Sequence, residues 1–219
     1  MLLTMETAPR HQCMIYQGSP AKTLAAVATT IQQKLSENFR CLYLNSPPMV
    51  AGMRSCLWAA GVYVSEEVAK ASLILSSEQN HLVDGQFDID LMIHMLQDQV
   101  EQALKDGYRG LWAVGDMTWE LGSEKNFEKL IEYEWRLEEY FRKQPALSGV
   151  CQYHVDTMPA EAAKQGLLTH PALFFNETLS RMNPCFVEPR SNTENAASDF
   201  TVDEVMSYLC ELQNIAEPA

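Results

Sequence analysis

The sequence predicts an α/β protein in which helices cover both faces of a mostly parallel sheet, a three-layer sandwich. Short apolar runs, such as Cys-Leu-Tyr-Leu at 41–44 and Leu-Trp-Ala-Val at 111–114, are typical of buried strands. Longer segments with apolar residues at helical spacing separate these runs. Because parallel strands need crossover connections, this alternation indicates successive βαβ units. With 219 residues, 47% of them hydrophobic, the chain can bury the core of one ordinary domain.

The expected elements follow in chain order. Strands are expected over residues 12–16, 40–45, 72–76, 110–115 and 147–154, with a further apolar run over 172–175. Helices are expected over residues 20–35, 49–60, 65–69, 89–106 and about 124–143. Ser19 is the expected N-cap of the first helix and Pro20 its first residue. We expect Pro47-Pro48 to interrupt the chain and Asp84-Gly85 to lie in a loop.

The organisation along the chain predicts one α/β domain and a separate terminal helix. The domain is expected over residues 1–188 and a polar linker over 189–200. An amphipathic helix is expected over residues 201–219, where Thr201 and Glu204 form a capping box. Its apolar stripe would dock on the domain or pair with another chain.

Charge and cysteine usage exclude several classes of protein. The formal net charge of −13 and the absence of a Lys/Arg cluster argue against nucleic acid and against anionic membranes as partners. No apolar run approaches the ~18 residues of a membrane span. The N-terminus has no secretory signal pattern. Six cysteines without CxxC spacing predict free thiols, so a cytoplasmic location is expected.

A candidate phosphate-binding loop follows the first expected strand. Such a loop needs two glycines that let its backbone wrap a phosphate, followed by Lys and a hydroxyl residue. The chain keeps Lys22 and Thr23, and Gly18 lies within the loop. However, Tyr16 and Ala21 stand where the first and second glycines belong, and Pro20 lacks a backbone N–H. We therefore expect a degenerate loop that begins a surface helix, with a working ATP site as the alternative.

The end of the expected 110–115 strand is a second candidate site. Ligands of open α/β sheets bind at the carboxyl ends of the strands, and Asp116, Trp119 and Glu120 follow this one. Four apolar residues before Asp116 also resemble the metal-bearing strand of P-loop ATPases. We expect a pocket here at the rim of the sheet. The alternative is a solvated loop with Trp119 folded onto the core.

A carboxylate falls within an apolar stripe on the expected long helix. Glu134 lies in line with five apolar residues: Phe127, Leu130, Ile131, Leu137 and Phe141. A buried carboxylate is costly unless it is paired or hydrogen-bonded. We therefore expect Glu134 to meet a specific donor, in an internal bond that fixes the helix to the sheet or in a ligand site.

Dispersed histidine and cysteine residues form a weaker signal. The set comprises His11, Cys13, Cys151, His154 and His170. On an unbroken strand Cys151 and His154 point to opposite faces, so the two cannot share one metal ion. His11, Cys13, Cys151 and His170 remain as candidate metal or redox ligands. The alternative is that these residues are satisfied core histidines and buried free thiols.

Five short motifs in a fixed order resemble the MEDS domain, the sensory domain named for methanogens, methylotrophs and the regulator DcmR. They are His11-x-Cys13-x-x-Tyr16, Gly115-Asp116-Met117-Thr118-Trp119, Tyr133-Glu134, Cys151-Gln152-Tyr153 and Thr169-His170-Pro171. The likeness covers about residues 10 to 176. It implies a fold related to the RecA and KaiC ATPases, a role in prokaryotic signalling and, by proposal, small hydrocarbon derivatives as ligands.

The resemblance also implies ligand-binding candidates, which together with Glu120 form the expected set: His11, Cys13, Tyr16, Asp116, Trp119, Glu120, Glu134, Cys151, Tyr153 and His170. Five aromatic residues are expected as pocket walls: Tyr16, Trp112, Trp119, Trp135 and Tyr153. Residues 177–219 are too few for a kinase or helix-turn-helix domain, so we expect the signal to pass through a partner protein, a homodimer or the C-terminal helix.

Three functions follow from these observations. The first is a non-catalytic sensor of a small organic ligand that acts with a signalling partner or as a homodimer. The second is a divergent RecA-like ATPase that uses Gly18, Lys22, Thr23 and Asp116. The third is a metal or redox sensor that uses the Cys and His residues named above.

Overall fold

The computed structural model describes residues 2–3, 9–122, 125–187 and 207, and its centre is an eight-stranded sheet. The strands are β1 (Leu2–Leu3), β2 (His11–Tyr16), β3 (Arg40–Leu44), β4 (Leu73–Ser76), β7 (Leu111–Asp116), β8 (Leu147–His154), β9 (Ala172–Asn176) and β10 (Leu179–Met182). Their order across the sheet is β1-β10-β9-β2-β8-β7-β3-β4. From β9 to β4 all neighbours are parallel, while β10 and β1 pair antiparallel at one edge. The predicted mostly parallel sheet is confirmed.

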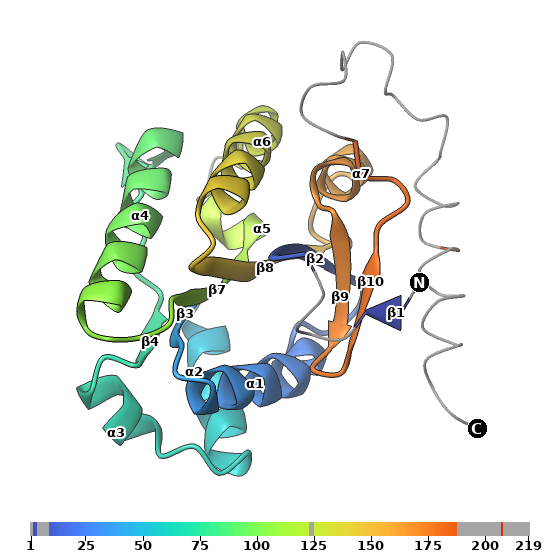
Figure 1. The fold of residues 1–219 in the computed structure, drawn as a ribbon. Coiled ribbons are helices and arrows are strands. Elements are labelled where there is room, and N and C mark those ends of the chain that lie inside the picture. The colour runs from blue at the N-terminus through green and yellow to red at the C-terminus, as the bar shows by residue number, and fades with distance from the viewer. Residues whose placement is uncertain (1, 4–8, 123–124, 188–206, 208–219) are drawn as a thin grey trace.

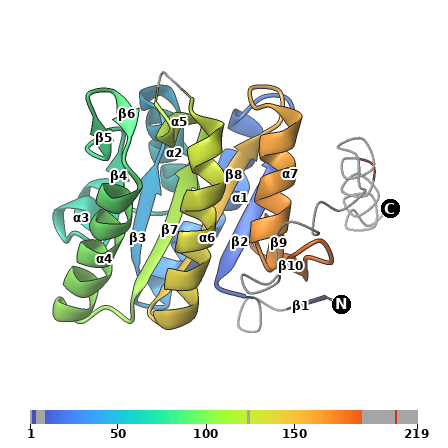
Figure 2. The same ribbon diagram turned by 90° about the horizontal axis from the view of Figure 1, so that it is seen from above.

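Helices cover both faces of this sheet. They are α1 (Ala21–Ser36), α2 (Pro47–Ala59), α3 (Val64–Ala69), α4 (Ile89–Lys105), α5 (Met117–Glu120), α6 (Phe127–Lys143) and α7 (Ala160–Thr169). Figure 1 shows α4, α6 and α7 on one face and α1 and α2 on the other. In Figure 2, α4, α6 and α7 lie side by side in front of the strands. The result is the expected three-layer arrangement.

Each face of the sheet contributes to its own hydrophobic core. Strand side chains alternate between the faces, so on β2 Cys13 joins the core under α4, α6 and α7, whereas Met14 joins the core over α1 and α2. All six residues of β2 and all five of β3 are buried. Burial on both faces explains why the apolar part of each strand forms a continuous run without polar alternation.

Helix starts are the main difference from the expected boundaries. Asn126 caps α6 by accepting hydrogen bonds from the backbone N–H groups of Glu128 and Lys129, which places the start at residue 127. Ser19 is not a cap, because Pro20 takes the N-cap position of α1 and makes no side-chain cap bond. Pro47 opens α2 and does not interrupt the chain, since proline fits the first turn of a helix.

Five short elements were not expected from the sequence, and β1 is one of them. The Asp84-Gly85 loop is the turn of a small hairpin formed by β5 (Leu82–Val83) and β6 (Gln86–Phe87). Both turn residues have positive φ, 51° at Asp84 and 80° at Gly85, as this kind of tight hairpin turn requires. The residues after β7 form α5, and β10 extends the sheet beyond β9.

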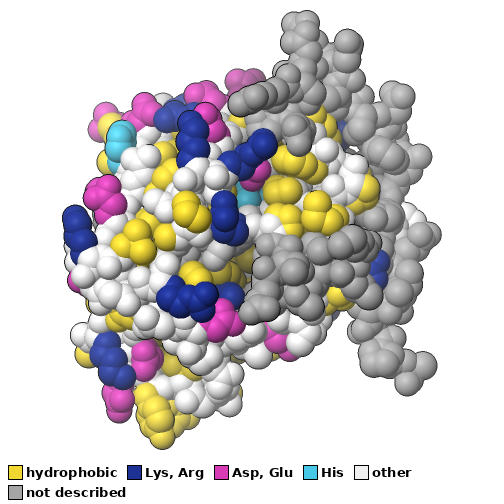
Figure 3. Space-filling view, in the orientation of Figure 1, with side chains coloured by type: hydrophobic (Ala, Val, Ile, Leu, Met, Phe, Trp, Pro, Cys, Tyr) yellow, Lys and Arg dark blue, Asp and Glu magenta, His cyan; other side chains and the backbone are white. Residues whose placement is uncertain are grey.

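The predicted linker at 189–200 lies outside the described residues, as does the predicted helix at 201–219 except for Ser207. Among the helices that the structure describes, none has the length and apolarity needed to cross a lipid bilayer. On the face in Figure 3, the Lys and Arg side chains that can be seen lie at several separate places between hydrophobic and acidic side chains.

Candidate functional site

A group of polar side chains is buried between the sheet and the helices α6 and α7. Its members are His11 on β2, Cys151 on β8, Glu134 on α6 and His170 directly after α7. One donor atom from each of the four lies within 4.8 Å of the other three. None of the four is more than 5% exposed. The structure thus brings together four residues that are up to 159 positions apart in the chain (170 − 11).

Glu134 is the centre of this group. Its Oε2 lies 3.5 Å from Nε2 of His11, 3.5 Å from Nε2 of His170 and 3.8 Å from Sγ of Cys151. Its Oε1 accepts a short hydrogen bond from the hydroxyl group of Tyr153. The prediction that Glu134 is buried and meets specific donors is confirmed, and these contacts fix α6 to the sheet.

The two histidines are anchored through their Nδ1 atoms. Nδ1 of His11 lies 3.0 Å from a carboxylate oxygen of Glu138, and Nδ1 of His170 lies 2.6 Å from the backbone oxygen of Gly166. Because both partners are acceptors, each Nδ1 carries a proton and donates it. Nε2 of His170 has no hydrogen-bond partner, although it is fully buried and lies next to Glu134.

Burial and charge set the protonation of the group. Burial lowers the pKa of His11, but the adjacent carboxylates of Glu134 and Glu138 outweigh it, so the pKa rises overall. Burial raises the pKa of Glu134, but the two histidines and Tyr153 outweigh it, so the pKa falls. Burial and the nearby His11 lower the pKa of His170 to about 3. The surroundings thus favour the protonated form of His11, the ionised form of Glu134 and the neutral form of His170.

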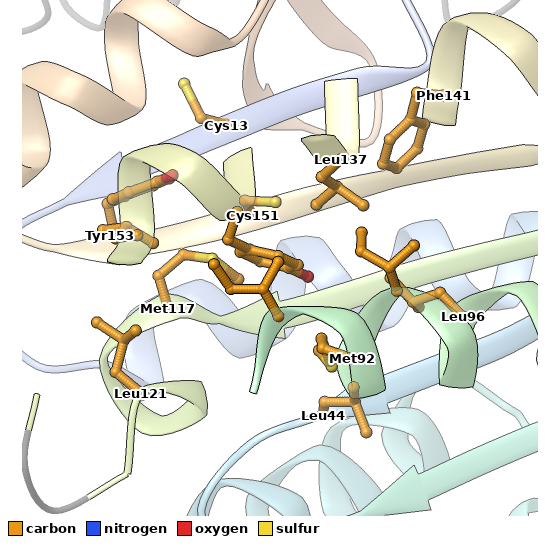
Figure 4. Packing of buried hydrophobic residues seen from close by; sticks show 14 of the residues in the cluster. Cys13, Leu44, Met92, Leu96, Met117, Leu121, Leu137, Phe141, Cys151 and Tyr153 are labelled. Atoms are coloured by element: carbon orange, nitrogen blue, oxygen red, sulfur yellow. The ribbon is translucent and has the colours of Figure 1, made fainter. Parts of the chain in front are cut away.

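Cys13 is not a member of the group, although the sequence placed it there. Cys13 is the register partner of Cys151 on the neighbouring strand, and its thiol is fully buried. Figure 4 shows both side chains on adjacent strands. The four-residue group contains Glu134 in its place. As expected, His154 lies on the opposite face from Cys151, where it stacks on Tyr16 with ring centroids 4.9 Å apart.

Glu138 is a site residue that the sequence analysis missed. It is 4% exposed and receives the Nδ1 hydrogen bond of His11. A usable signal was present, because Glu138 follows Glu134 by four residues and so lies on the same helix face. What the sequence did not show is that a histidine from β2 meets that face.

A small cavity of about 30 Å³ lies beside this group, between β7, β8 and the helices α4 and α6. Its lining is mostly apolar and includes Met92, Leu96, Met117, Leu137 and Phe141, which Figure 4 shows around Cys151. The polar members of the lining are Glu120, Tyr133 and Cys151. None of the five aromatic residues expected as walls lines this cavity.

Glu120 brings the one carboxyl group to the cavity wall. It is 2% exposed, and its Oε2 has no hydrogen-bond partner. Gly115 provides the space, because a β-carbon at that position would collide with Oε1 of Glu120. Burial, together with the carboxylates of Glu134 and Asp116, raises the pKa of Glu120 well above its usual value. These surroundings favour the protonated form of the group, which can both donate and accept hydrogen bonds.

Asp116 and Trp119 do not line this cavity, whereas Glu120, the third residue expected at the end of β7, does. Asp116 caps α5 by accepting a hydrogen bond of 2.8 Å from the backbone N–H of Trp119. It also accepts a longer bond of 3.4 Å from the hydroxyl group of Tyr16. Trp119 is half-buried and packs against the core. These residues hold the end of β7 in place.

The loop from residue 18 to 23 uses its polar groups within the protein. The backbone N–H of Gly18 donates to the carboxylate of Asp156 over 2.7 Å. Thr23 is buried, and its hydroxyl group donates to the backbone oxygen of Pro20 over 2.8 Å. Lys22 is exposed on the first turn of α1. The backbone N–H of Gly18 is thus engaged by a carboxylate.

Comparison with known families identifies the chain. The family model of the MEDS domain, the MEthanogen/methylotroph, DcmR Sensory domain, matches residues 10–171. This chain belongs to the MEDS family. The match includes every residue of the buried group around Glu134 and the wall of the cavity. No curated protein matches the chain in sequence.

Membership in the MEDS family supports a role in sensing and signalling. The ten residues expected at the ligand site divide into two sets in this MEDS domain. His11, Glu134, Cys151, Tyr153 and His170 are in direct contact around Glu134, with Cys13 and Glu120 close by in the same layer. Tyr16 and Trp119 both contact Asp116 at the end of β7, Tyr16 through its hydroxyl group and Trp119 through its backbone N–H.

Proposed function

We propose that this MEDS domain is a non-catalytic sensor that binds a small organic molecule in the cavity between the sheet and the helices α4 and α6. The observation that carries the proposal is the unpartnered, fully buried carboxyl oxygen of Glu120 in the wall of an otherwise apolar cavity. An apolar space with a few polar groups that fix orientation is the usual form of a small-molecule site.

The size of the cavity limits the ligand. A cavity must offer ~10–15 Å³ to hold one water molecule. This cavity of about 30 Å³ therefore holds about two waters or an organic molecule of very few non-hydrogen atoms. Met92 and Met117 line the cavity, and the flexible methionine side chain can adjust to a slightly larger guest.

The chemistry of the wall selects an uncharged molecule. Burial and the neighbouring carboxylates raise the pKa of Glu120 and so disfavour the charged form that would bind a cation. A single hydroxyl, carbonyl, thiol or halogen group on a short carbon skeleton fits a wall with one carboxyl group. This class agrees with the small hydrocarbon derivatives that the family resemblance implied.

Methionine methyl NMR of the full chain tests the proposal. A panel of short alcohols, aldehydes, thiols and halogenated methanes is titrated into protein labelled at the methionine methyl groups. We expect at least one compound to shift the Met92 and Met117 signals and to leave the signal of Met53, which is buried on the opposite face, unchanged. A panel in which no compound moves the Met92 and Met117 signals would refute the proposal.

A matched pair of variants checks the role of Glu120. Glu120→Gln keeps the volume of the side chain and exchanges the carboxyl group for an amide, whereas Glu66→Gln makes the same change at a position that is exposed on α3. We expect weaker binding only for Glu120→Gln. Sedimentation with and without the active compound then reports whether binding changes the association of the chain with itself.

The second candidate function is the RecA-like ATPase. The contacts of residues 18–23 favour the sensor, because the Asp156 carboxylate at Gly18 would repel a phosphate. Isothermal titration with Mg-ATP separates the two functions. Binding tighter than ~100 µM, about −5.5 kcal/mol, that is lost in Lys22→Ala would favour the nucleotide-binding function over the sensor.

A further inference from the structure

A second site lies in the same layer of the fold, and it does not depend on the sensor function proposed above. We infer that the chain binds one divalent metal ion of the zinc type through four buried side chains: His11, Glu134, Cys151 and His170. These residues come from β2, α6, β8 and the end of α7, so the ion would join two helices to the sheet.

The spacing of the donor atoms fits a tetrahedral ion. With metal–ligand bonds of about 2.0–2.3 Å, the edges of such a tetrahedron are about 3.3–3.8 Å. Glu134 Oε2 lies 3.5 Å from Nε2 of His11 and 3.5 Å from Nε2 of His170. Sγ of Cys151 lies 3.5 Å from Nε2 of His11 and 3.8 Å from Oε2 of Glu134. Four of the six edges therefore already have the required length, and the other two lie within 4.8 Å.

The orientation of the histidines is an independent observation. A histidine that binds a metal through Nε2 usually donates its Nδ1 proton to a carboxylate or a backbone oxygen, which fixes the ring. His11 does this with Glu138, and His170 does it with Gly166. The unpartnered Nε2 of His170 is directed into the group although it is 0% exposed. A metal ion would satisfy this atom.

Charge and donor type indicate which ion fits. The Cys151 thiolate and the Glu134 carboxylate together carry two negative charges, which balance a divalent cation in a buried environment. Two imidazole nitrogens, one sulfur and one carboxylate oxygen suit zinc and exclude the oxygen-binding ions calcium and magnesium. Binding displaces the thiol proton of Cys151 and any proton on Nε2 of His11, because the ligands are the thiolate and the neutral imidazole.

Four protein ligands would close the coordination sphere. Closed sites of this kind stabilise structure, whereas catalytic zinc sites keep one position open for water. The ligands are buried, so the ion would be loaded while the chain folds or when α7 opens transiently from the sheet. Cys151 also lines the cavity, so an ion bound here would lie next to the proposed organic ligand. The binding of that ligand would not require the ion.

Cobalt substitution tests the site. The full chain is unfolded and refolded without oxygen in the presence of Co²⁺, and excess ion is removed. We expect about one cobalt per chain, a thiolate-to-cobalt charge-transfer band and the intense visible absorption of tetrahedral coordination. Zinc should then displace the cobalt and raise the melting temperature. A metal content below ~0.2 per chain after refolding would refute the site.

Cys13, on the neighbouring strand β2, provides a matched control for Cys151. Cys13→Ser and Cys151→Ser change the same residue type at paired positions, both buried, on neighbouring strands. We expect Cys151→Ser to abolish the charge-transfer band and Cys13→Ser to retain it. Loss of the band in Cys13→Ser alone would contradict the assignment. Circular dichroism establishes that each variant folds, and Glu134→Gln gives a second test, with the band kept but the metal affinity reduced at least tenfold.

Discussion

The carboxyl group of Glu120 occupies the space over Gly115 that a side chain at residue 115 would fill. Glycine on a buried central strand is unfavourable by itself, because it packs nothing and loses more backbone freedom on folding than other residues. Here its missing side chain admits a carboxyl group from α5 into the layer between the sheet and the helices. The position of the Glu120 carboxyl group in the cavity wall therefore depends on glycine at residue 115.

Gly115→Ala should therefore destabilise the fold by displacing Glu120. We expect a loss of about 1–3 kcal/mol in the free energy of unfolding, the range for overpacking a core. Urea denaturation measures it. In the Glu120→Ala background the same change should cost much less, because the colliding group is gone. Equal losses in the free energy of unfolding in the two backgrounds would show that Gly115 is not needed to make room for Glu120.

Tyr153→Phe should weaken the contact between α6 and the sheet. The change removes the hydrogen bond that the hydroxyl group donates to the ionised Glu134. Hydrogen bonds to charged groups contribute about 1.5–3 kcal/mol, against about 0.5–1.5 kcal/mol for neutral pairs. Tyr43→Phe is the control, because its buried hydroxyl group accepts a bond of 3.1 Å from the neutral Asn45. Thermal unfolding should show the larger loss for Tyr153→Phe.

Acidification should destabilise the protein through His81. Its Nε2 donates to the backbone oxygen of Glu120 over 2.8 Å, and burial lowers its pKa. The unfolded chain therefore takes up a proton near pH 6.5 that the folded chain does not, so stability is present above that pH and is lost as the pH falls below it. One such group contributes a slope of at most about 1.4 kcal/mol per pH unit.

Urea denaturation between about pH 7 and pH 5 measures this slope. His81→Gln should reduce it, and His94→Gln, which changes a histidine that is exposed on α4, should leave it as in the unaltered chain. An unchanged slope in His81→Gln would assign the acid sensitivity to other groups.

Asp116 should act as a helix cap and not as a ligand group. Asp116→Ala removes the bond to the backbone N–H of Trp119 and should cost about 1 kcal/mol of stability. Asp116→Asn keeps a cap acceptor and should cost less than half as much. Chemical denaturation compares the two variants. If Asn proves as damaging as Ala, the charge of Asp116, and not its capping bond, is what the fold requires.

The boundaries of the elements could be predicted where the chain itself carries the cause. Apolar runs gave the parallel strands, and Gly107 marked the end of α4. The start of α6 was placed too early because the capping bond of Asn126 depends on a loop conformation that composition does not reveal. The Pro47-Pro48 pair predicts an interruption of the chain, but proline is also common in a first helical turn, which is where the structure places it.

The candidate site was predictable only in part. Glu134 within an apolar stripe was a sound signal, because burying a carboxylate requires a partner wherever the helix packs. The sequence does not show whether Cys13 or Glu134 joins Cys151 in the buried group. The two cysteines are register partners on one face, and only the approach of α6 and α7 determines which donor atoms meet.

The sequence by itself determined the layered α/β fold, the family and the residue types available for chemistry, since periodicity, motif order and composition are local properties of a chain. The tertiary structure alone decided that His11 and His170 meet over Glu134, and that Asp116 caps a helix while Glu120 faces a cavity. The physical reason is that contacts between distant segments depend on strand order and helix packing. Single positions along the sequence do not encode either one.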